Sequence, residues 1–337
     1  MRYRTIPNTD IKLSEIGFGC WTMGGPNWSQ HSGEQIGWAD VNEDDITSAI
    51  KLGIDQGVNH FDNADIYGNG RAERLLAKAI NSLAIKRADL VIATKVGHAW
   101  GTAPHPYEPH HIRRQCEQSL RNLNTDHIDI YYFHHGSFAP DNQPGNIQDA
   151  AAEMHRLVDE GKVRAVGQSA YSDKDFARAI PIVKPNVLQS WAHMLADNFI
   201  RPDSKLQQLM AEHNCTFVAF SPLAQGRLLD KFDPQRPPAF DEGDNRNRPS
   251  RDGSNPFSKQ SLTELQPKMD ALKARFGSTT EDLASAALRF ILAHDNIASV
   301  IPGFRNAKQA ACNVGPATDP PFSQEDLTFC RTLFAAD

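Results

Sequence analysis

The residues of this sequence that could transfer a proton fall where successive apolar segments end. Asp62 ends one such segment, and Tyr67 follows it in the next polar stretch. The two apolar segments that come next end in Lys95 and His134. A single lysine or histidine at such a place is usually a solvated surface residue. Four reactive groups at corresponding positions of consecutive segments favour a catalytic site, since active sites gather ionisable side chains.

These four side chains suit acid catalysis by a phenol. A free tyrosine has a pKa near ~10, which is too high for an efficient acid at neutral pH. A nearby ammonium group lowers such a pKa, so Lys95 is expected to activate Tyr67 while Asp62 holds the lysine in place. His134 could hydrogen-bond the substrate oxygen. The set contains no hydride source and no serine or thiol nucleophile, so a reduction would need a cofactor.

The apolar segments alternate with amphipathic ones, which predicts an α/β protein. They are rich in β-branched and aromatic residues, as parallel strands covered on both faces should be. Eight alternating units favour a closed (β/α)8 TIM barrel over an open sheet, and chemistry in such a barrel occurs at the C-terminal ends of the strands. Strands are expected over residues 16–19, 58–62, 90–96, 127–134, 163–169, 187–191, 217–221 and 297–301, and helices over 42–54, 71–84, 108–123, 147–160, 173–180, 204–213, 280–294 and 306–313.

Three further features lie outside this alternation. Residues 2–6 and 11–14 flank a turn-forming cluster, which predicts an N-terminal β-hairpin. Residues 224–260, after the seventh strand, are rich in Pro, Asp, Asn and Arg and are expected to form a long flap over the active site. Residues 323–334 predict an extra C-terminal helix. Since no linker divides the chain, residues 1–337 are expected to form a single domain.

Composition narrows the class of protein. Hydrophobic residues make up 40% of the 337 residues, which is enough for a full core. The net charge of -6 gives no electrostatic reason to expect nucleic acid or an anionic membrane as a partner. No apolar run reaches the length of a membrane span, and the first residues lack the apolar segment of a secretory signal. Five scattered cysteines without a C-x-x-C pair favour the cytoplasm.

Several motifs of the chain are similar to those of one barrel family. The G-x-G-x-x-G fingerprint of dinucleotide-binding folds does not occur. The chain instead resembles the aldo-keto reductases, a family that binds nicotinamide cofactors without a Rossmann fold. The resemblance implies an oxidoreductase in which Asp62, Tyr67, Lys95 and His134 form a tetrad, with Tyr67 as general acid toward a small carbonyl or alcohol substrate. It rests on residues 61–68, 93–95, 128–134, 220–223 and 301–303.

The resemblance also implies where the cofactor binds. Ser169 and Gln189 would hydrogen-bond the nicotinamide carboxamide, and Phe220 would stack on its ring. The guanidinium of Arg305 would grip the 2′-phosphate of NADP(H), which makes NADP(H) the expected cofactor and NAD(H) the alternative. The other implied cofactor contacts are Trp21, Ser221, Leu223, Gln225, Gly226, Gly303, Gln309 and Asn313.

Substrate recognition is expected from loops around the rim. We expect Trp21, Trp28, Trp100 and His135 to line the substrate pocket, together with part of the flap up to Arg251. Aromatic side chains suit sugars and aryl aldehydes alike, while the polar residues of the flap favour sugar-like carbonyls. The sequence assigns no oligomeric state.

Two other interpretations of the same residues remain open. His60, Asp62 and His134 could be the metal ligands of a barrel hydrolase. Against this, Lys95 would lie among those ligands and repel the cation, so no metal site is predicted. The chain could also be a cofactor-binding regulatory subunit with little turnover, as some members of the resembled family are. A complete tetrad favours turnover.

Overall fold

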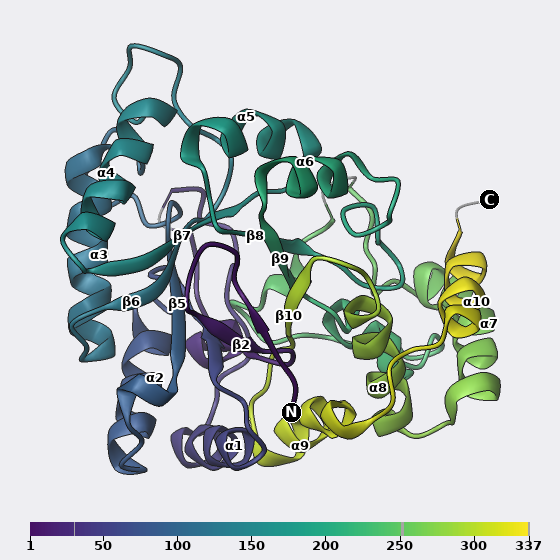
Figure 1. The fold of residues 1–337 in the computed structure, drawn as a ribbon. Helices are drawn as coiled ribbons and strands as arrows, with labels where there is room; N and C mark the ends of the chain where they lie inside the picture. The colour runs from purple at the N-terminus through teal and green to yellow at the C-terminus, as the bar shows by residue number, and fades with distance from the viewer. Residues whose placement is uncertain (30, 251–252, 336–337) are drawn as a thin grey trace.

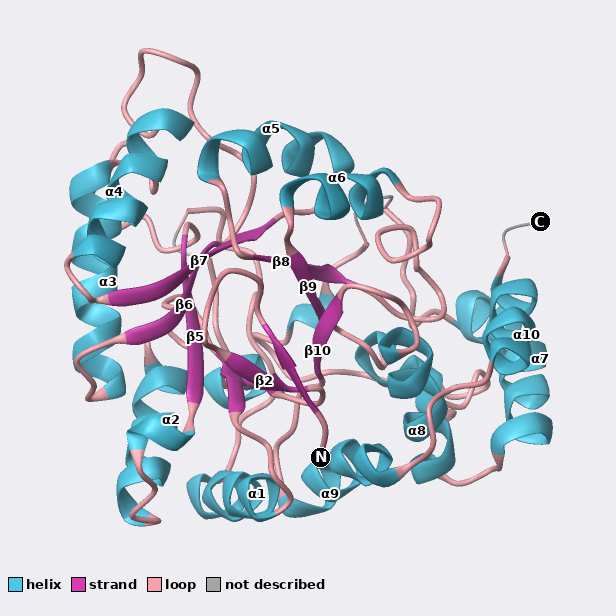
Figure 2. Ribbon diagram, in the orientation of Figure 1, coloured by secondary structure: helices cyan, strands magenta, loops and turns pink. Residues whose placement is uncertain are grey.

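The centre of the fold is an eight-stranded parallel sheet that closes into a barrel. Neighbouring strands follow chain order from β3 to β10. Backbone bridges from Ile16 to Val300 and from Gly19 to Gly303 join the first strand to the last. Helices surround the strands on the outside (Figure 1 and Figure 2). The predicted (β/α)8 barrel is therefore confirmed.

The computed structural model describes residues 1–29, 31–250 and 253–335. The hairpin consists of β1 Tyr3–Thr5 and β2 Lys12–Ser14, and the barrel of β3 Phe18–Gly19, β4 His60–Asp62, β5 Val91–Val96, β6 Ile128–Phe133, β7 Val163–Ser169, β8 Val187–Trp191, β9 Thr216–Phe220 and β10 Ile297–Ile301. The helices are α1 Glu43–Asp55, α2 Arg71–Ser82, α3 Pro109–Leu123, α4 Ile147–Asp159, α5 Asp173–Val183, α6 Lys205–His213, α7 Lys259–Phe276, α8 Thr280–Leu292, α9 Ala307–Val314 and α10 Gln324–Phe334.

Local sequence explains where many of these helices begin. The side chains of Asn42, Ser172, Ser204 and Thr279 accept hydrogen bonds from backbone N–H groups at the starts of α1, α5, α6 and α8. Such caps satisfy donors that would otherwise have no partner in the first turn. The predicted hairpin and the extra C-terminal helix are present as well.

One helix was not predicted. α7 spans Lys259–Phe276 and follows the flap, and among its residues only Leu262, Met269 and Leu272 are buried. Its apolar stripe is therefore thin, and Pro267 lies inside it. A weak period and an internal proline both reduce the signal for a helix in sequence. The flap itself runs from residue 224 to the start of α7, and Arg251 lies outside the described residues.

The barrel interior is packed with side chains and is closed at one end by the hairpin. Ile130 and Tyr132 of β6 and Val218 of β9 belong to one buried cluster inside the barrel. Ile11 and Leu13, in and beside the hairpin, pack into the same cluster. The hairpin accordingly lies across the middle of the barrel in Figure 1. This leaves the opposite rim, where the strands end, for chemistry.

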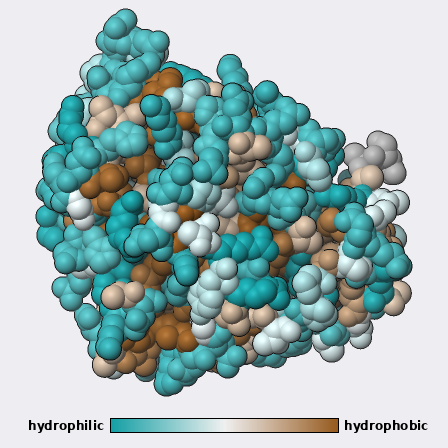
Figure 3. All heavy atoms as spheres, in the orientation of Figure 1, coloured by the Kyte–Doolittle hydropathy of each residue, from teal (hydrophilic) through white to brown (hydrophobic). Residues whose placement is uncertain are grey.

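One face of the molecule is mostly polar. The face in Figure 3 is largely hydrophilic, with apolar side chains visible in small areas between polar ones. Within the described parts of the chain, every helix is too short or too polar to cross a bilayer.

Candidate active site

The structure brings Asp62, Lys95 and Tyr67 together at the rim where β4 and β5 end. Lys95 Nζ donates hydrogen bonds to Asp62 Oδ2 at 2.5 Å and to the carbonyl oxygen of Asn63 at 2.6 Å. The same nitrogen lies 3.4 Å from Tyr67 Oη. Lys95 is fully buried. The ammonium therefore directs its three N–H bonds at the strand end and at the phenol.

His134 lies directly after β6, with its ring against that of Tyr67. Its ring centroid is 5.9 Å from that of Tyr67, with the two rings nearly perpendicular. The His134 ring is buried, and its Nδ1 has no hydrogen-bond partner in the described part of the chain. Burial, with smaller contributions from His98 and Lys95, holds the pKa of His134 well below its usual value. A neutral imidazole with an unused nitrogen can hydrogen-bond a substrate oxygen.

The pKa of Tyr67 differs from the prediction. Burial, followed by the carboxylate of Asp62, raises the pKa of Tyr67 well above its ordinary value. The expected lowering by Lys95 is wrong for the free protein, because loss of hydration outweighs the ammonium. The phenol therefore keeps its proton, which is the state that a general acid needs. Lys95, 3.4 Å away, is placed to stabilise the oxyanion once the proton has left.

Trp21 packs against the phenol of Tyr67. Its ring stacks on Tyr67 with centroids 5.8 Å apart and an interplanar angle of 20°. Its Nε1 donates to the carbonyl oxygen of Ile36 at 2.8 Å, and Trp38 packs edge-on against it. These contacts fix one wall of the site and place Trp21 where both a substrate and a nicotinamide would be expected.

The other predicted pocket residues lie farther out or face away. Trp28 is 43% exposed, and Trp100 stacks on His31 with centroids 4.6 Å apart. His135 is buried, with Nε2 bonded to the carbonyl oxygen of Gly97 and Nδ1 accepting from the backbone of Ser137. Both nitrogens of His135 thus hold loop backbone. These contacts favour a role for His135 in shaping the loop. Its assignment to the substrate pocket stays a prediction.

The residues expected to hold the nicotinamide line the next strand ends. Ser169 Oγ at the end of β7 is buried and has no hydrogen-bond partner among the described residues. Gln189 in β8 is buried, and its amide nitrogen donates to Asp62 Oδ1 at 2.7 Å. Phe220 ends β9, with its ring 6.4 Å from that of Trp191. An unpaired buried hydroxyl and a flat ring beside the tetrad fit a nicotinamide carboxamide.

The loop after β9 has an unusual backbone. Ser221, Ala224 and Gln225 are non-glycine residues with positive φ values of 54°, 48° and 58°. Gly226 follows at 90°, where a side chain would be strained. Non-glycine residues with a left-handed backbone conformation cost free energy and tend to occur where a ligand is held. Consecutive turns of this kind point backbone N–H groups at anions, which fits the implied pyrophosphate contacts.

Three cations gather beyond that loop. Burial, followed by the charge of Arg246, lowers the pKa values of Lys231 and Arg305. Arg246 is bidentate with the buried Asp244, but neither Lys231 nor the Arg305 guanidinium has a carboxylate partner in the parts of the chain that are described. Arg305 is half-buried and Lys231 is exposed, and cations that gather in this way without carboxylate partners fit a phosphate group. Lys231 and Arg246 were not predicted individually, because within a polar flap nothing distinguishes them from solvated residues.

The remaining predicted cofactor residues are partly engaged with backbone. Asn313 donates from Nδ2 to the carbonyl oxygen of Gly303 at 3.1 Å. Gln309 Oε1 accepts from the backbone N–H of Arg305 at 3.0 Å. Leu223 lies in the strained loop after β9 and is half-buried. These contacts shape the start of α9 beside the cation group, and contact with an adenine stays a prediction.

The donor set does not favour a metal. His60 is fully buried below Asp62, and its Nδ1 lies 3.0 Å from Ser299 Oγ inside the barrel. The ammonium of Lys95 lies against the Asp62 carboxylate that a metal would need. In the described residues, no three His, Cys, Asp or Glu side chains are grouped so that they could hold a metal ion.

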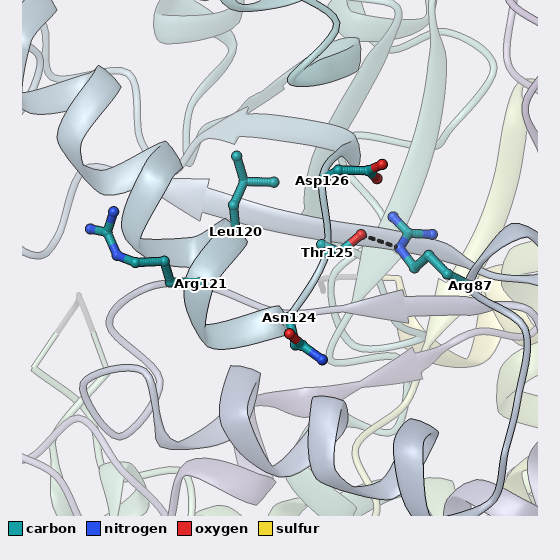
Figure 4. A pocket seen from close by; sticks show the side chains of 6 residues that line it. All are labelled: Arg87, Leu120, Arg121, Asn124, Thr125 and Asp126. Atoms are coloured by element: carbon teal, nitrogen blue, oxygen red, sulfur yellow. Dashed lines mark hydrogen bonds between the residues drawn. The ribbon is translucent and has the colours of Figure 1, made fainter.

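A separate surface hollow lies at the other end of the barrel strands, before β5 and β6. It has a volume of about 650 Å³. Arg87 reaches across it and donates to Thr125 Oγ1 at 3.0 Å (Figure 4). Arg87 also donates to Asp129 Oδ2 at 2.6 Å. These groups are already paired with one another, and the hollow contains none of the tetrad. It is lined by Arg87, Leu120, Arg121, Asn124, Thr125 and Asp126.

Comparison with known proteins agrees with this barrel and rim. The sequence model of the Aldo/keto reductase family matches residues 15–333. The chain is 25% identical to the oxidoreductase YqkF of Bacillus subtilis, over 97% of this chain and 94% of that protein. It is 25% identical to L-galactose dehydrogenase of Arabidopsis thaliana, over 94% of this chain and 88% of that protein.

A solved structure shows the same fold. The glycerol dehydrogenase AKR11B4 from Gluconobacter oxydans superposes with a TM-score of 0.76 and 23% sequence identity, covering 99% of this chain and 95% of that one. The chain belongs to the aldo/keto reductase family. It is an oxidoreductase that uses a nicotinamide cofactor and acts on small carbonyl or alcohol substrates.

Proposed function

We propose that the protein reduces an aldehyde or ketone to an alcohol with NADPH, and that Tyr67 is the general acid. The observation that carries the proposal is the contact of Lys95 Nζ with both Asp62 and Tyr67 at a buried strand end. The cofactor supplies a hydride to the carbonyl carbon. Tyr67 Oη gives its proton to the carbonyl oxygen, and Lys95 stabilises the phenolate that remains. His134 orients the same oxygen through a hydrogen bond.

Three groups of residues would hold the cofactor. Ser169 and Gln189 would bind the carboxamide, and the ring of Phe220 would support the nicotinamide face. The strained backbone from Ser221 to Gly226 would bind the pyrophosphate. Arg305, helped by Lys231 and Arg246 of the flap, would bind the 2′-phosphate, which supports NADP(H) over NAD(H) because only NADP(H) carries that charge. The residues expected at the adenine end and along the groove are Trp21, Leu223, Gln225, Gly303, Gln309 and Asn313.

Arg305→Ala is expected to weaken NADPH binding by about 10- to 100-fold and NADH binding by less than about threefold. A charge-assisted contact of this kind contributes roughly 1.5–3 kcal/mol, and NADH has no group to receive it. The measurement is the dissociation constant for each nucleotide, followed by quenching of tryptophan fluorescence. Arg236→Ala, which removes an exposed arginine of the same flap, is the matched control. Equal losses for both nucleotides would show that Arg305 does not recognise the 2′-phosphate.

Several contacts attach the flap to the first loop, among them an ion pair of Arg248 with Glu34 and two hydrogen bonds of Gln35. Gln35 Oε1 accepts from the backbone N–H of Gly243 at 2.7 Å and from Asn247 Nδ2 at 3.0 Å. Gly37 and Gly243 also share a backbone hydrogen bond of 2.9 Å. Since Lys231 and Arg246 lie on this flap, the attachment would hold them over the bound cofactor.

Gln35→Ala is expected to speed NADPH dissociation by about tenfold. The substitution removes two hydrogen bonds at roughly 0.5–1.5 kcal/mol each, and the lost energy appears as easier opening of the flap. The rate is measured by stopped-flow displacement of bound NADPH. Gln143→Ala, at an exposed position of another loop, should leave it unchanged. If Gln35→Ala releases NADPH at the unmodified rate, the flap does not retain the cofactor.

For the substrate we propose a polar, hydroxylated carbonyl compound. L-galactose and glycerol, which name the activities of two relatives, both carry hydroxyl groups next to the reacting carbon. Trp21, Trp28 and Trp100 would offer flat faces to such a molecule, and His135 would shape the loop behind them. We also propose that the 337 residues act as a single domain and, from five cysteines that are all free, that the protein is cytoplasmic.

The test of the function is the absorbance of NADPH with a panel of hydroxylated and aryl aldehydes, with and without chelator. Turnover that is insensitive to chelator supports the reductase. Tight NADPH binding without turnover on any aldehyde would support a regulatory subunit instead. Chelator-sensitive hydrolysis would support the metal enzyme.

A further inference from the structure

Two carboxyl groups that the proposed reaction does not use are buried behind the tetrad. Asp65 lies in the loop between Asp62 and Tyr67, and Glu73 lies in the first turn of α2, directly after that loop. Asp65 is almost fully buried and Glu73 is completely buried. Neither forms an ion pair in the described residues. Buried carboxyl groups without a cation are rare enough to need an explanation.

One face of α3 binds both of these carboxyl groups. Gln115 Nε2 donates to Asp65 Oδ2 at 2.8 Å, and Asn122 Nδ2 donates to Glu73 Oε2 at 2.8 Å. Gln115 and Asn122 are seven residues apart, which is two helical turns, so they project from the same side of α3. A row of amide donors on one helix therefore meets the back of the catalytic loop and the start of α2.

The same two carboxyl groups are connected to the catalytic residues. The backbone N–H of Asp65 donates to the carbonyl oxygen of Lys95 at 3.4 Å. Glu73 Oε1 accepts from Thr94 Oγ1 at 2.7 Å, and Thr94 immediately precedes Lys95 in β5. A shift of Asp65 would thus move the loop that carries Tyr67 relative to the strand end that carries Lys95. That separation, 3.4 Å between Lys95 Nζ and Tyr67 Oη, is the distance on which proton transfer depends.

We propose that Asp65 is a positioning residue, whose neutral carboxyl group fastens the loop of Tyr67 to Gln115 of α3 and so sets the distance between Tyr67 and Lys95. The neutral form follows from the surroundings of the group. Asp65 Oδ1 is buried without a hydrogen-bond partner among the described residues, and Glu73 lies nearby as a second acid. The nearest cation, Lys95, already binds Asp62. An ionised carboxylate in such a place would be poorly solvated.

The titration of Asp65 agrees with this arrangement. Burial raises the pKa of Asp65 from 3.8 to about 8, with Glu73 raising it further and Gln115 and Lys95 opposing the change. The native protein therefore keeps a proton between about pH 4 and 8 that the unfolded chain releases. Stability from this group falls as pH rises through that interval and changes no further above it. The titratable groups that face Asp65 are Tyr67, Glu73, Lys95, Tyr107 and Tyr131.

The test compares Asp65→Asn with Asp65→Ala. Asparagine has the shape of the neutral acid, and its oxygen can still accept from Gln115, but it cannot ionise. Asp65→Asn is expected to keep kcat within about threefold at pH 7. The unmodified enzyme is expected to lose kcat above about pH 8, as Asp65 ionises, and Asp65→Asn is expected to show no such decline. Asp65→Ala removes the contact and is expected to lower kcat by about tenfold at every pH, with KM for NADPH unchanged. Gln115→Leu should reproduce that loss.

A stability measurement is independent of turnover. The Tm of Asp65→Asn minus that of the unmodified protein should grow between pH 5 and pH 9, whereas Asp141→Asn, at an exposed position, should show a constant difference. The kinetic comparison rests on the proposed reductase activity, and the Tm comparison does not. Parallel Tm curves for Asp65→Asn and the unmodified protein, or an unchanged kcat in Asp65→Ala, would overturn the role of Asp65. Absence of turnover in the unmodified enzyme would contradict the proposed function alone.

Discussion

Tyr67→Phe is expected to lower kcat for carbonyl reduction by about 100-fold or more while leaving NADPH affinity nearly unchanged. The substitution removes only the hydroxyl, so the ring can keep its stacking on Trp21 and its burial beside Lys95. General acid catalysis by a positioned side chain contributes roughly 10²–10⁴-fold, and His134 offers a hydrogen bond but is held neutral by its burial. The measurements are kcat under saturating substrate and the NADPH dissociation constant by tryptophan fluorescence.

The matched control for this variant is Tyr131→Phe. Tyr131 is a buried tyrosine on β6 that belongs to a cluster between the strands and the surrounding helices, and its hydroxyl donates to the carbonyl oxygen of Ile112 at 3.4 Å. Loss of that hydroxyl should cost some stability and little activity. Full activity in Tyr67→Phe, with normal folding, would remove the phenol from the mechanism.

The meeting of Asp62, Lys95 and His134 was predictable because it depends on register along strands. Each residue ends an apolar run, and parallel neighbours in a barrel present their ends at one rim. The observed register pairs Asp62 with Ala93 and Lys95 with Tyr132, so each member of the set lies two residues beyond the partner of the member before it, at the same rim. Strand periodicity and chain order carry this information, and both can be read from the sequence.

The pKa of Tyr67 was not predictable in the same way. A sequence shows that a lysine is near a tyrosine, but the sign of the shift depends on how much water the fold removes from the phenol. In this protein burial is nearly complete, so the pKa rises despite Lys95. The sequence also could not predict that the Gln189 amide binds Asp62. The two side chains are 127 residues apart, and only the fold brings them together.

Long-range contacts within polar segments form the other class of missed features. Gln35 binding to the flap, and the approach of Lys231 and Arg246 to Arg305, depend on how two irregular loops dock. Such loops have no period that would align one with the other. The row of Gln115 and Asn122 on α3 has helical spacing, yet its acceptors Asp65 and Glu73 lie in other elements. The spacing of residues along a helix identifies its polar face, but only the fold shows which groups that face contacts.

Lys95→Met is expected to lower kcat by about 100- to 1,000-fold and to destabilise the protein. Removal of the ammonium leaves the Asp62 carboxylate buried, with Gln189 as its remaining side-chain donor. Breaking a buried ion pair by removing one partner costs about 3–5 kcal/mol, so Tm should fall as well. Since lost activity could then reflect lost folding, kcat is measured at a temperature well below the Tm of the variant.

The double variant Asp62→Asn with Lys95→Met separates the two effects. Two neutral side chains of similar size leave no uncompensated charge, so most of the lost stability should return. Activity should not return, because no cation remains near Tyr67 Oη to stabilise the phenolate. Recovery of Tm together with kcat would mean that Lys95 serves only to neutralise Asp62. Recovery of Tm without recovery of kcat would show that the Lys95 ammonium takes part in the chemical step itself.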